Sequence, residues 1–244
     1  MEGLDKIEKK RGSLVDQVED RLMNYCKDKG LKPGDGVPNE TELAAEFGVA
    51  RSVVREALSR FKMMGMIESR TKRGMVITPI TLFGCMKTGL LPELMGEDSL
   101  FELLEFRVAL EIGISGIVFR SMNPDYLRQL METVRFGGAE KDSRYSTESE
   151  LAFHTKMYEI TGNGSVMQFA KIISPVLEFA NEKYGVYFAP IQKKLDARGL
   201  HVNHQYLVDT LESGSEIAYK KAVENHFKAY TIYIENRKKL KHDE

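Results

Sequence analysis

The sequence is poor in cysteine, lacks tryptophan and has no excess of charge of either sign. Its two cysteines, Cys26 and Cys85, exclude a disulfide-rich fold and a cysteine-rich zinc site, and they favour a reducing compartment. The formal net charge of −1 excludes the global basic balance by which composition alone would indicate nucleic-acid binding. Any basic surface must therefore be local.

Long apolar runs are also missing. No window approaches the roughly 18 consecutive apolar residues of a membrane span, and the first residues, MEGLDKIEKKRGSL, lack the apolar region of a signal peptide. We therefore expect a cytoplasmic protein with no membrane partner. A chain of 244 residues with 42% hydrophobic residues has enough apolar content for two domains with packed cores.

Helix and turn signals follow one another closely near the N-terminus. Apolar residues at helical spacing between Ser13 and Gly30 predict a first helix. Asn39 can cap a second helix, and a third opens near Arg51 after a glycine-containing turn. The segment MIESRTKRGMVIT alternates apolar and polar residues around a basic tip, which predicts a hairpin. This order of elements predicts a winged helix-turn-helix.

The remainder of the chain is mainly helical. Prolines and glycines interrupt the apolar residues of 79–98, which predicts a connection between domains. Six helix-length apolar stripes then predict an antiparallel bundle. The expected fold class is mainly α, with a winged helix-turn-helix over 1–78 and an all-helical domain over 99–244. The last three helices are expected over residues 165–188, 190–213 and 215–240.

The third expected helix carries arginines although it must bury an apolar stripe. Val54, Leu58 and Phe61 form that stripe, whereas Arg51 and Arg55 lie one turn apart on the other face. In a helix-turn-helix this face enters the major groove, where arginine can form two hydrogen bonds with guanine. The arginines therefore suggest DNA recognition.

A basic patch is expected around this helix, because residues 51–73 contain seven basic residues and two acidic ones. For two isolated arginines a solvated helix face would be the better explanation, but the turn, the apolar stripe and the basic hairpin together favour DNA binding. Arg60 is the weakest member because it can pair with Glu56 one turn earlier. The candidate DNA contacts are Arg51, Ser52 and Arg55 on the helix and Arg70, Lys72 and Arg73 on the hairpin.

The segment LKPGDGVPNETELAAEFGVARSVVREALSRFKMMGMIESRTKRGMVI resembles the DNA-binding domain of the GntR family of bacterial transcription regulators. The shared features are the Pro-Gly turn, ELA, FGV, VREAL and a glycine-containing wing, and the likeness covers about residues 13–78. It implies that Arg51 and Arg55 contact the bases or phosphates of a palindromic double-stranded DNA operator bound by a homodimer. Thr41 stands where the family usually has a basic residue, so it joins the candidate DNA contacts and the operator preference can differ.

Four side chains of the expected bundle have a spacing that suits a metal. Glu150 and His154 are four residues apart and therefore share one helix face. His204 and His226 lie 22 residues apart on two later segments. If the four converge, one carboxylate and three imidazoles can bind a divalent transition metal such as Zn, Ni or Mn and leave positions for water or a ligand. On spacing alone, each histidine is more often an ordinary core or surface residue.

The second half of the chain resembles FCD, the helical effector domain of the FadR subfamily of GntR regulators. The residues that fit its motif are Glu150, Phe153, His154, Gly162, Asn163, His204 and His226. The family carboxylate is usually Asp, so the longer Glu150 either adopts another rotamer or lowers the metal affinity. Some members lack the metal and bind a lipid-like effector, which makes metal occupancy a hypothesis. His201 lies outside the motif and is a reserve ligand.

Arg107 is a charged residue in an otherwise apolar stretch, LEFRVALE. The FCD resemblance implies that its side chain faces the effector cavity, where a guanidinium can clamp a carboxylate. An open metal beside an arginine would suit a small carboxylate or hydroxy acid as effector. The alternative is a structural ion pair with Glu111 one turn further along.

These features favour a ligand-responsive bacterial transcription factor, most often a repressor in this family, over an enzyme. One alternative is a metal-dependent hydrolase, against which stand the absence of an HExxH motif and the complete DNA-reading domain. The other is a DNA-binding protein whose metal is purely structural.

Overall fold

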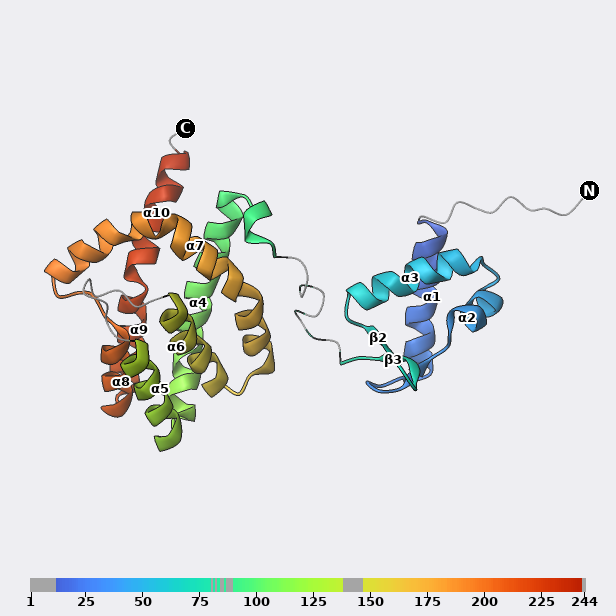
Figure 1. The fold of residues 1–244 in the computed structure, drawn as a ribbon, viewed down its shortest axis with the longest axis horizontal. Helices are drawn as coiled ribbons and strands as arrows, with labels where there is room; N and C mark the ends of the chain where they lie inside the picture. The colour runs from blue at the N-terminus through green and yellow to red at the C-terminus, as the bar shows by residue number, and fades with distance from the viewer. Residues whose placement is uncertain are drawn as a thin grey trace, which may run out of the picture. The chain divides into compact units, whose positions relative to one another are not determined.

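The computed structural model describes residues 12–79, 81, 83, 86, 90–137 and 147–242. The chain divides into two units, Met1–Gly89 and Leu90–Glu244, each described here by itself (Figure 1). In the described part of the chain, no helix combines the length and the apolar character needed to cross a membrane. Cys85 lies outside the described residues, and Cys26 is a free, half-buried thiol.

The first unit is built on three helices, α1 (Leu14–Asp28), α2 (Glu40–Phe47) and α3 (Arg51–Met63). Both α1 and α2 begin with a capping box, which satisfies the free N–H groups of the first turn. α2 ends at Gly48, whose φ of +66° is the left-handed conformation that glycine adopts at little cost. This turn sets α3 across α2, and the two helices form the expected helix-turn-helix.

A three-stranded antiparallel sheet completes the unit. β2 (Ile67–Arg70) and β3 (Gly74–Ile77) form the expected hairpin, with Ser69 opposite Met75. β1 (Gly36–Val37) pairs with the other edge of β3, giving the order β1-β3-β2. The sequence indicated only a turn at β1, because a two-residue strand depends on its distant partner. The most buried apolar residues of this unit include Val18, Leu22, Val54, Ala57, Leu58, Phe61 and Ile67.

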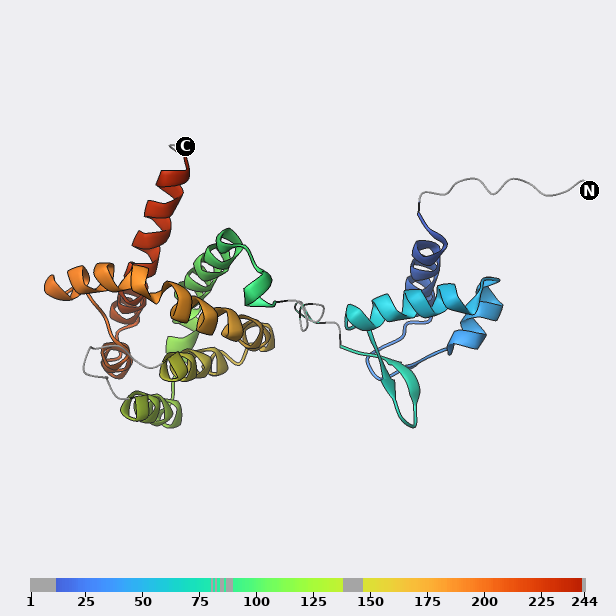
Figure 2. The same ribbon diagram turned by 45° about the horizontal axis from the view of Figure 1, so that its top comes forward.

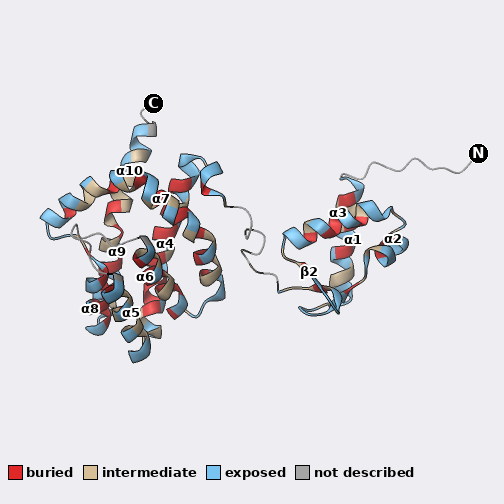
Figure 3. Cartoon of the chain, in the orientation of Figure 1, coloured by how far each residue is buried: buried red, intermediate tan, exposed pale blue. Residues whose placement is uncertain are grey.

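The second unit contains a short 3-10 turn, η2 (Pro92–Leu94), and seven α-helices within the described residues. α4 (Glu97–Ser121) packs against helices from the rest of the unit, and ten of its 25 residues are buried (Figure 3). The turned view shows α7 and α10 crossing beside it (Figure 2). The other helices are α5 (Pro124–Gly137), α6 (Thr147–Ile160), α7 (Gly164–Ala197), α8 (His204–Glu212), α9 (Glu216–His226) and α10 (Lys228–His242).

The last three expected helices differ from those observed. α7 continues through Pro190 to Ala197, because Leu195 beyond the proline is still buried, and this packing compensates for the hydrogen bond that proline removes. The expected helix over 190–213 is therefore the end of α7, a turn and α8. The final expected helix is divided at Phe227 into α9 and α10, which gives seven helices instead of six.

Candidate metal centre and DNA-contacting helix

α6, α8 and α9 bring the four candidate metal ligands together. One donor atom each from Glu150, His154, His204 and His226 lie within 4.8 Å of one another. Oε2 of Glu150 is 3.5 Å from Nε2 of His154 and 3.5 Å from Nε2 of His204. Nε2 of His226 is 3.4 Å from Nε2 of His154. Each of the three imidazoles thus presents Nε2 to another member of the cluster, and their role as ligands stays a prediction.

Local structure places these histidines. Asn203 caps α8 by accepting a hydrogen bond from the backbone, so His204 is the first residue of that helix. The His204 ring stacks on the Phe153 ring of α6, with centroids 4.0 Å apart and an interplanar angle of 12°. His226 is the last residue of α9, where the chain turns into α10. The helix ends therefore point two of the histidines at the ligand-bearing face of α6.

The Nδ1 atoms of two histidines are engaged by acceptors outside the cluster. Nδ1 of His154 is 2.5 Å from Oε2 of Glu111, and Nδ1 of His226 is 2.7 Å from the carbonyl oxygen of Val202. When Nδ1–H donates to these acceptors, the Nε2 lone pair faces the centre. Metal-ligating histidines in proteins use this arrangement, in which a carboxylate or carbonyl fixes the tautomer. These contacts fit a bound metal.

Burial and neighbouring charges also favour metal-binding ionisation states. Burial raises the pKa of Glu150, but the charges and hydrogen bonds of His204 and His154 hold it well below its ordinary value. Burial, reinforced by His204 and His154, lowers the pKa of His226 to about 3, and burial also lowers the pKa of His204. A metal requires deprotonated carboxylates and neutral imidazoles, and each of these three shifts is in the direction that favours the form that binds a metal.

His154 differs because a second carboxylate faces it. Burial lowers its pKa, but the charge of Glu111 and the hydrogen bond to it outweigh burial and raise the pKa above its ordinary value. His201, the reserve ligand, lies outside the four-residue cluster, and its Nδ1 is 2.6 Å from Oδ1 of Asp196. The cluster of the described residues therefore consists of the four side chains selected by spacing and motif.

Arg107 forms the ion pair that was the alternative to an effector clamp. Its Nε donates to Oε1 of Glu111 at 2.7 Å, and both side chains are 6% exposed. The Tyr158 hydroxyl donates to the same oxygen at 2.7 Å, and the guanidinium lies 5.5 Å from the Phe227 ring centroid. Glu111 therefore links Arg107 to His154. The i, i+4 spacing revealed the first contact, whereas no sequence signal revealed the second.

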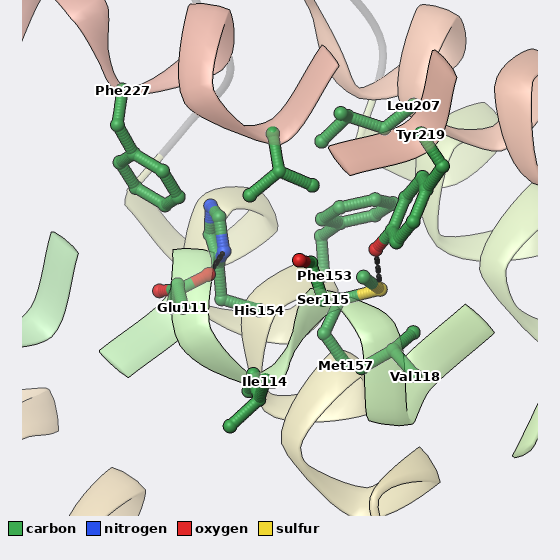
Figure 4. Close-up of a pocket in the computed structure, with 11 residues that line it drawn as sticks. Glu111, Ile114, Ser115, Val118, Phe153, His154, Met157, Leu207, Tyr219 and Phe227 are labelled. Carbon is green, nitrogen blue, oxygen red and sulfur yellow. Dashed lines mark hydrogen bonds and ion pairs between the residues drawn. The ribbon is translucent and has the colours of Figure 1, made fainter. Parts of the chain in front are cut away.

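A small cavity adjoins this network (Figure 4). Its volume is about 10 Å³, which is room for roughly one water molecule. Figure 4 shows the Glu111 carboxylate beside His154 and the Tyr219 hydroxyl directed at Met157. Ser115 is drawn between these two pairs. The rest of the lining is apolar. A hydroxy acid does not fit into this volume, so its entry would require side chains to move.

The candidate DNA contacts lie on exposed positions of the first unit. The inner stripe of α3 is buried, whereas Arg51, Ser52 and Arg55 are exposed at its N-terminal end. The N-cap residue, Ala50, makes no side-chain capping hydrogen bond. The free backbone N–H groups of a helix N-terminus that lacks a side-chain cap can donate hydrogen bonds to a phosphate oxygen of DNA. The remaining candidates, which are also exposed, are Thr41 on α2 and Arg70, Lys72 and Arg73 at the hairpin tip.

Arg60 is engaged within the protein. Its Nη2 donates to Glu56 at 2.9 Å, which confirms the expected pair. Its Nη1 also donates to Asp16 at 3.0 Å and lies 3.4 Å from Glu19, both on α1. Arg60 therefore ties α3 to α1, and the α1 partners could not be read from local spacing.

A family model for bacterial regulatory proteins of the gntR family matches residues 14–77, and a model for the FCD domain matches residues 102–229. The chain belongs to the GntR family. The two models match the helix-turn-helix unit and most of the helical unit, and they confirm the expected mainly α fold class. This GntR-family protein is a transcription regulator, so the hydrolase alternative is wrong.

Relatives and a solved structure agree with this assignment. The HTH-type transcriptional regulator LutR of Bacillus subtilis (strain 168) is 27% identical over 191 residues, covering 78% of this chain and 86% of LutR. Rv0494, an uncharacterized HTH-type transcriptional regulator of Mycobacterium tuberculosis, is 40% identical over 154 residues, covering 63% of this chain and 64% of that protein. The structure of Streptococcus agalactiae GntR has the same fold, with a TM-score of 0.52 and 22% identity over 88% of this chain and 97% of that one.

Proposed function

We propose that this GntR-family protein is a cytoplasmic, homodimeric repressor of the FadR subfamily that senses a small carboxylate or hydroxy acid at a metal centre. The observation that carries the proposal is the convergence of one carboxylate and three imidazole nitrogens within 4.8 Å. A protein of Escherichia coli (strain K12) assigned by name to an L-lactate dehydrogenase operon is 24% identical over 225 residues, 87% of this chain. That relationship supports a hydroxy acid as the effector.

Glu150 and Nε2 of His154, His204 and His226 would hold Zn, Ni or Mn. The bound metal would supply an electrophilic centre with coordination positions left for an oxygen of the effector. Arg107 would contribute the N–H donors that its pair with Glu111 does not use, and so clamp an effector carboxylate. Because the adjoining cavity is so small, effector binding would favour a different arrangement of these side chains. That difference would couple the centre to DNA binding.

A DNA-binding domain over residues 1–78 would bind the operator with α3 in the major groove, and residues 79–98 would join it to the effector and dimerisation domain, 99–244. A dimer would present two such helices to the two half-sites of a palindrome. On each protomer, the residues that we propose contact DNA are Thr41, Arg51, Ser52, Arg55, Arg70, Lys72 and Arg73.

Elemental analysis of the purified protein tests the metal centre. We expect about one transition metal per chain, and we expect His154→Ala to lose it because Nε2 of His154 lies next to both Glu150 and His226. His201→Ala is the matched control, since His201 lies outside the cluster and should retain the metal. A protein that contains no metal as purified and takes up none from Zn or Ni would contradict the proposal.

A purely structural metal is the second candidate, favoured by the small volume of the adjoining cavity. It predicts that metal removal lowers the melting temperature while small acids have no effect on DNA binding. An electrophoretic mobility shift assay with and without L-lactate separates the two candidates, because a change in affinity with L-lactate supports sensing.

A further inference from the structure

Arg55 of α3 meets a carboxylate from the preceding helix. Glu40 is the first residue of α2, and its Oε2 accepts hydrogen bonds from Nε and Nη2 of Arg55, each at 3.1 Å. Its Oε1 lies 3.4 Å from Nε. The Arg55 side chain is 62% exposed and that of Glu40 is 31% exposed, so the pair lies at the surface where DNA would approach. The two residues are 15 positions apart, and the sequence alone did not indicate their contact.

The contact occupies one particular edge of the guanidinium. The group carries five N–H donors in a planar fork, and Glu40 takes the side edge, which consists of Nε–H and one N–H of Nη2. The end edge, formed by Nη1 and the other N–H of Nη2, keeps its donors. Two parallel hydrogen bonds from that edge suit O6 and N7 of guanine. Glu40 therefore leaves the end edge available for base recognition.

A carboxylate beside Arg55 also disfavours contacts of this arginine with DNA phosphates. An exposed arginine near DNA is attracted to many phosphates, and this attraction carries no sequence information. A negative charge beside Arg55 repels phosphate and limits the rotamers of the guanidinium. Glu40 itself lies in the first turn of α2, where the helix dipole favours a negative charge. The hydrogen bond and the charge of Arg55 also lower the pKa of Glu40.

We propose that Glu40 is a positioning residue that directs Arg55 to read a guanine in the operator. This inference rests on the proposed DNA contact of Arg55. Arg51 lies one turn earlier on the same helix and, among the described residues, has no carboxylate within ion-pair distance. We therefore assign guanine recognition to Arg55, the arginine that Glu40 holds by hydrogen bonds.

Selection from a library of random DNA duplexes with the full-length protein tests the inference. We expect the parent protein to enrich a palindrome that has guanine at one fixed position. The Arg55→Ala protein should no longer prefer guanine at that position. Glu40→Gln should weaken the preference for that guanine by about tenfold while binding to unrelated duplex stays equal or becomes tighter. Glu46→Gln is the matched control, because it removes one exposed negative charge from the same helix without a hydrogen bond to Arg55. Circular dichroism of each variant establishes that it is folded.

Three results would overturn the inference in distinguishable ways. If Arg55→Ala loses the guanine preference and Glu40→Gln keeps it in full, the role of Glu40 is wrong and the proposed function stands. If the preferences of both variants equal those of the parent, Arg55 does not read the base and neither assignment holds. If Glu46→Gln weakens the preference as much as Glu40→Gln, the effect comes from general charge, which also overturns the inference.

Discussion

At the scale of single residues, Glu111 connects three side chains from two helices. Its Oε1 accepts from Arg107 and Tyr158, and its Oε2 lies against Nδ1 of His154. Burial raises the pKa of Glu111, but the charges of His154 and Arg107 hold it well below its ordinary value. A buried charge is tolerated when its lone pairs are satisfied by hydrogen bonds. Glu111 is thus positioned to orient a metal ligand and to neutralise Arg107.

Glu111→Gln preserves the shape of the side chain and removes its charge. We expect zinc affinity to fall by about 10-fold to 100-fold, because the partner that orients His154 is altered. We also expect the free energy of unfolding to fall by about 3 to 5 kcal/mol, since Arg107 is left buried without a counter-charge. Isothermal titration calorimetry and urea unfolding measure the two effects.

The control for this substitution is Glu105→Gln, which removes a carboxylate from the surface of the same helix. Glu105 pairs with Lys238 at 2.6 Å, and exposed pairs contribute less than about 1 kcal/mol. A Glu111→Gln protein with unchanged zinc affinity would show that Glu111 does not orient His154.

At the scale of elements, the turn between α2 and α3 depends on Gly48. Its φ of +66° lies in the left-handed region, and its N–H donates to the Ala44 carbonyl. A Cβ at this position would meet nothing within 4 Å, so a side chain is disfavoured by the backbone conformation and not by crowding. The same turn brings Glu40 to Arg55, and it therefore affects the reading surface as well as the stability.

Gly48→Ala should lower the free energy of unfolding by about 1 kcal/mol, through backbone strain alone. Gly113→Ala is the matched substitution, since Gly113 is in the interior of α4 and its Cβ would also meet nothing within 4 Å. It should raise stability by about 0.5 to 1 kcal/mol, because alanine favours the helix. Urea unfolding followed by circular dichroism measures both. Equal changes of the same sign would contradict the assignment of the turn.

At the scale of the whole molecule, the metal centre would tie together three helices that are far apart in the chain. Glu150 and His154 come from α6, His204 from α8 and His226 from α9. A ligand that binds only the folded protein stabilises it in proportion to the logarithm of its concentration. Metal binding should therefore stabilise the helical unit, and an effector on the metal should add to this.

Chelation of the metal should lower the melting temperature, and added zinc should restore it. His204→Ala should melt at a temperature that does not respond to chelator, whereas His201→Ala should respond as the parent does, because only His204 belongs to the cluster. Differential scanning calorimetry gives the comparison. A response in His204→Ala equal to that of the parent would remove His204 from the ligand set.

L-lactate serves as a probe for the effector. With metal present, L-lactate at 100 times its dissociation constant should stabilise the protein by about 2.7 kcal/mol. Arg107→Met should reduce this stabilisation, because the proposed clamp for the carboxylate is absent, while zinc binding persists. Calorimetry with chloride in place of L-lactate is the control for ionic strength. An undiminished response in Arg107→Met would assign Arg107 to its ion pair with Glu111 alone.

The sequence by itself determined the elements whose signals are local. The capping box at Asn39, the left-handed turn at Gly48 and the buried stripe of α3 act within a few residues, so the helix-turn-helix could be predicted together with its exposed arginines. The metal quartet was selected by spacing and family motif, and packing then brought Glu150 and His154 to the two later histidines.

Only the tertiary structure decided the contacts between distant segments. Burial beyond Pro190 keeps α7 helical where the local rule for proline predicted a break. The contact of Glu111 with His154 spans 43 residues, and that of Glu40 with Arg55 spans 15. Spacing along one helix reveals neighbours three or four residues apart, whereas these pairs depend on how helices pack. The residues that position the proposed metal ligand and the proposed DNA contact therefore emerged only from the folded chain.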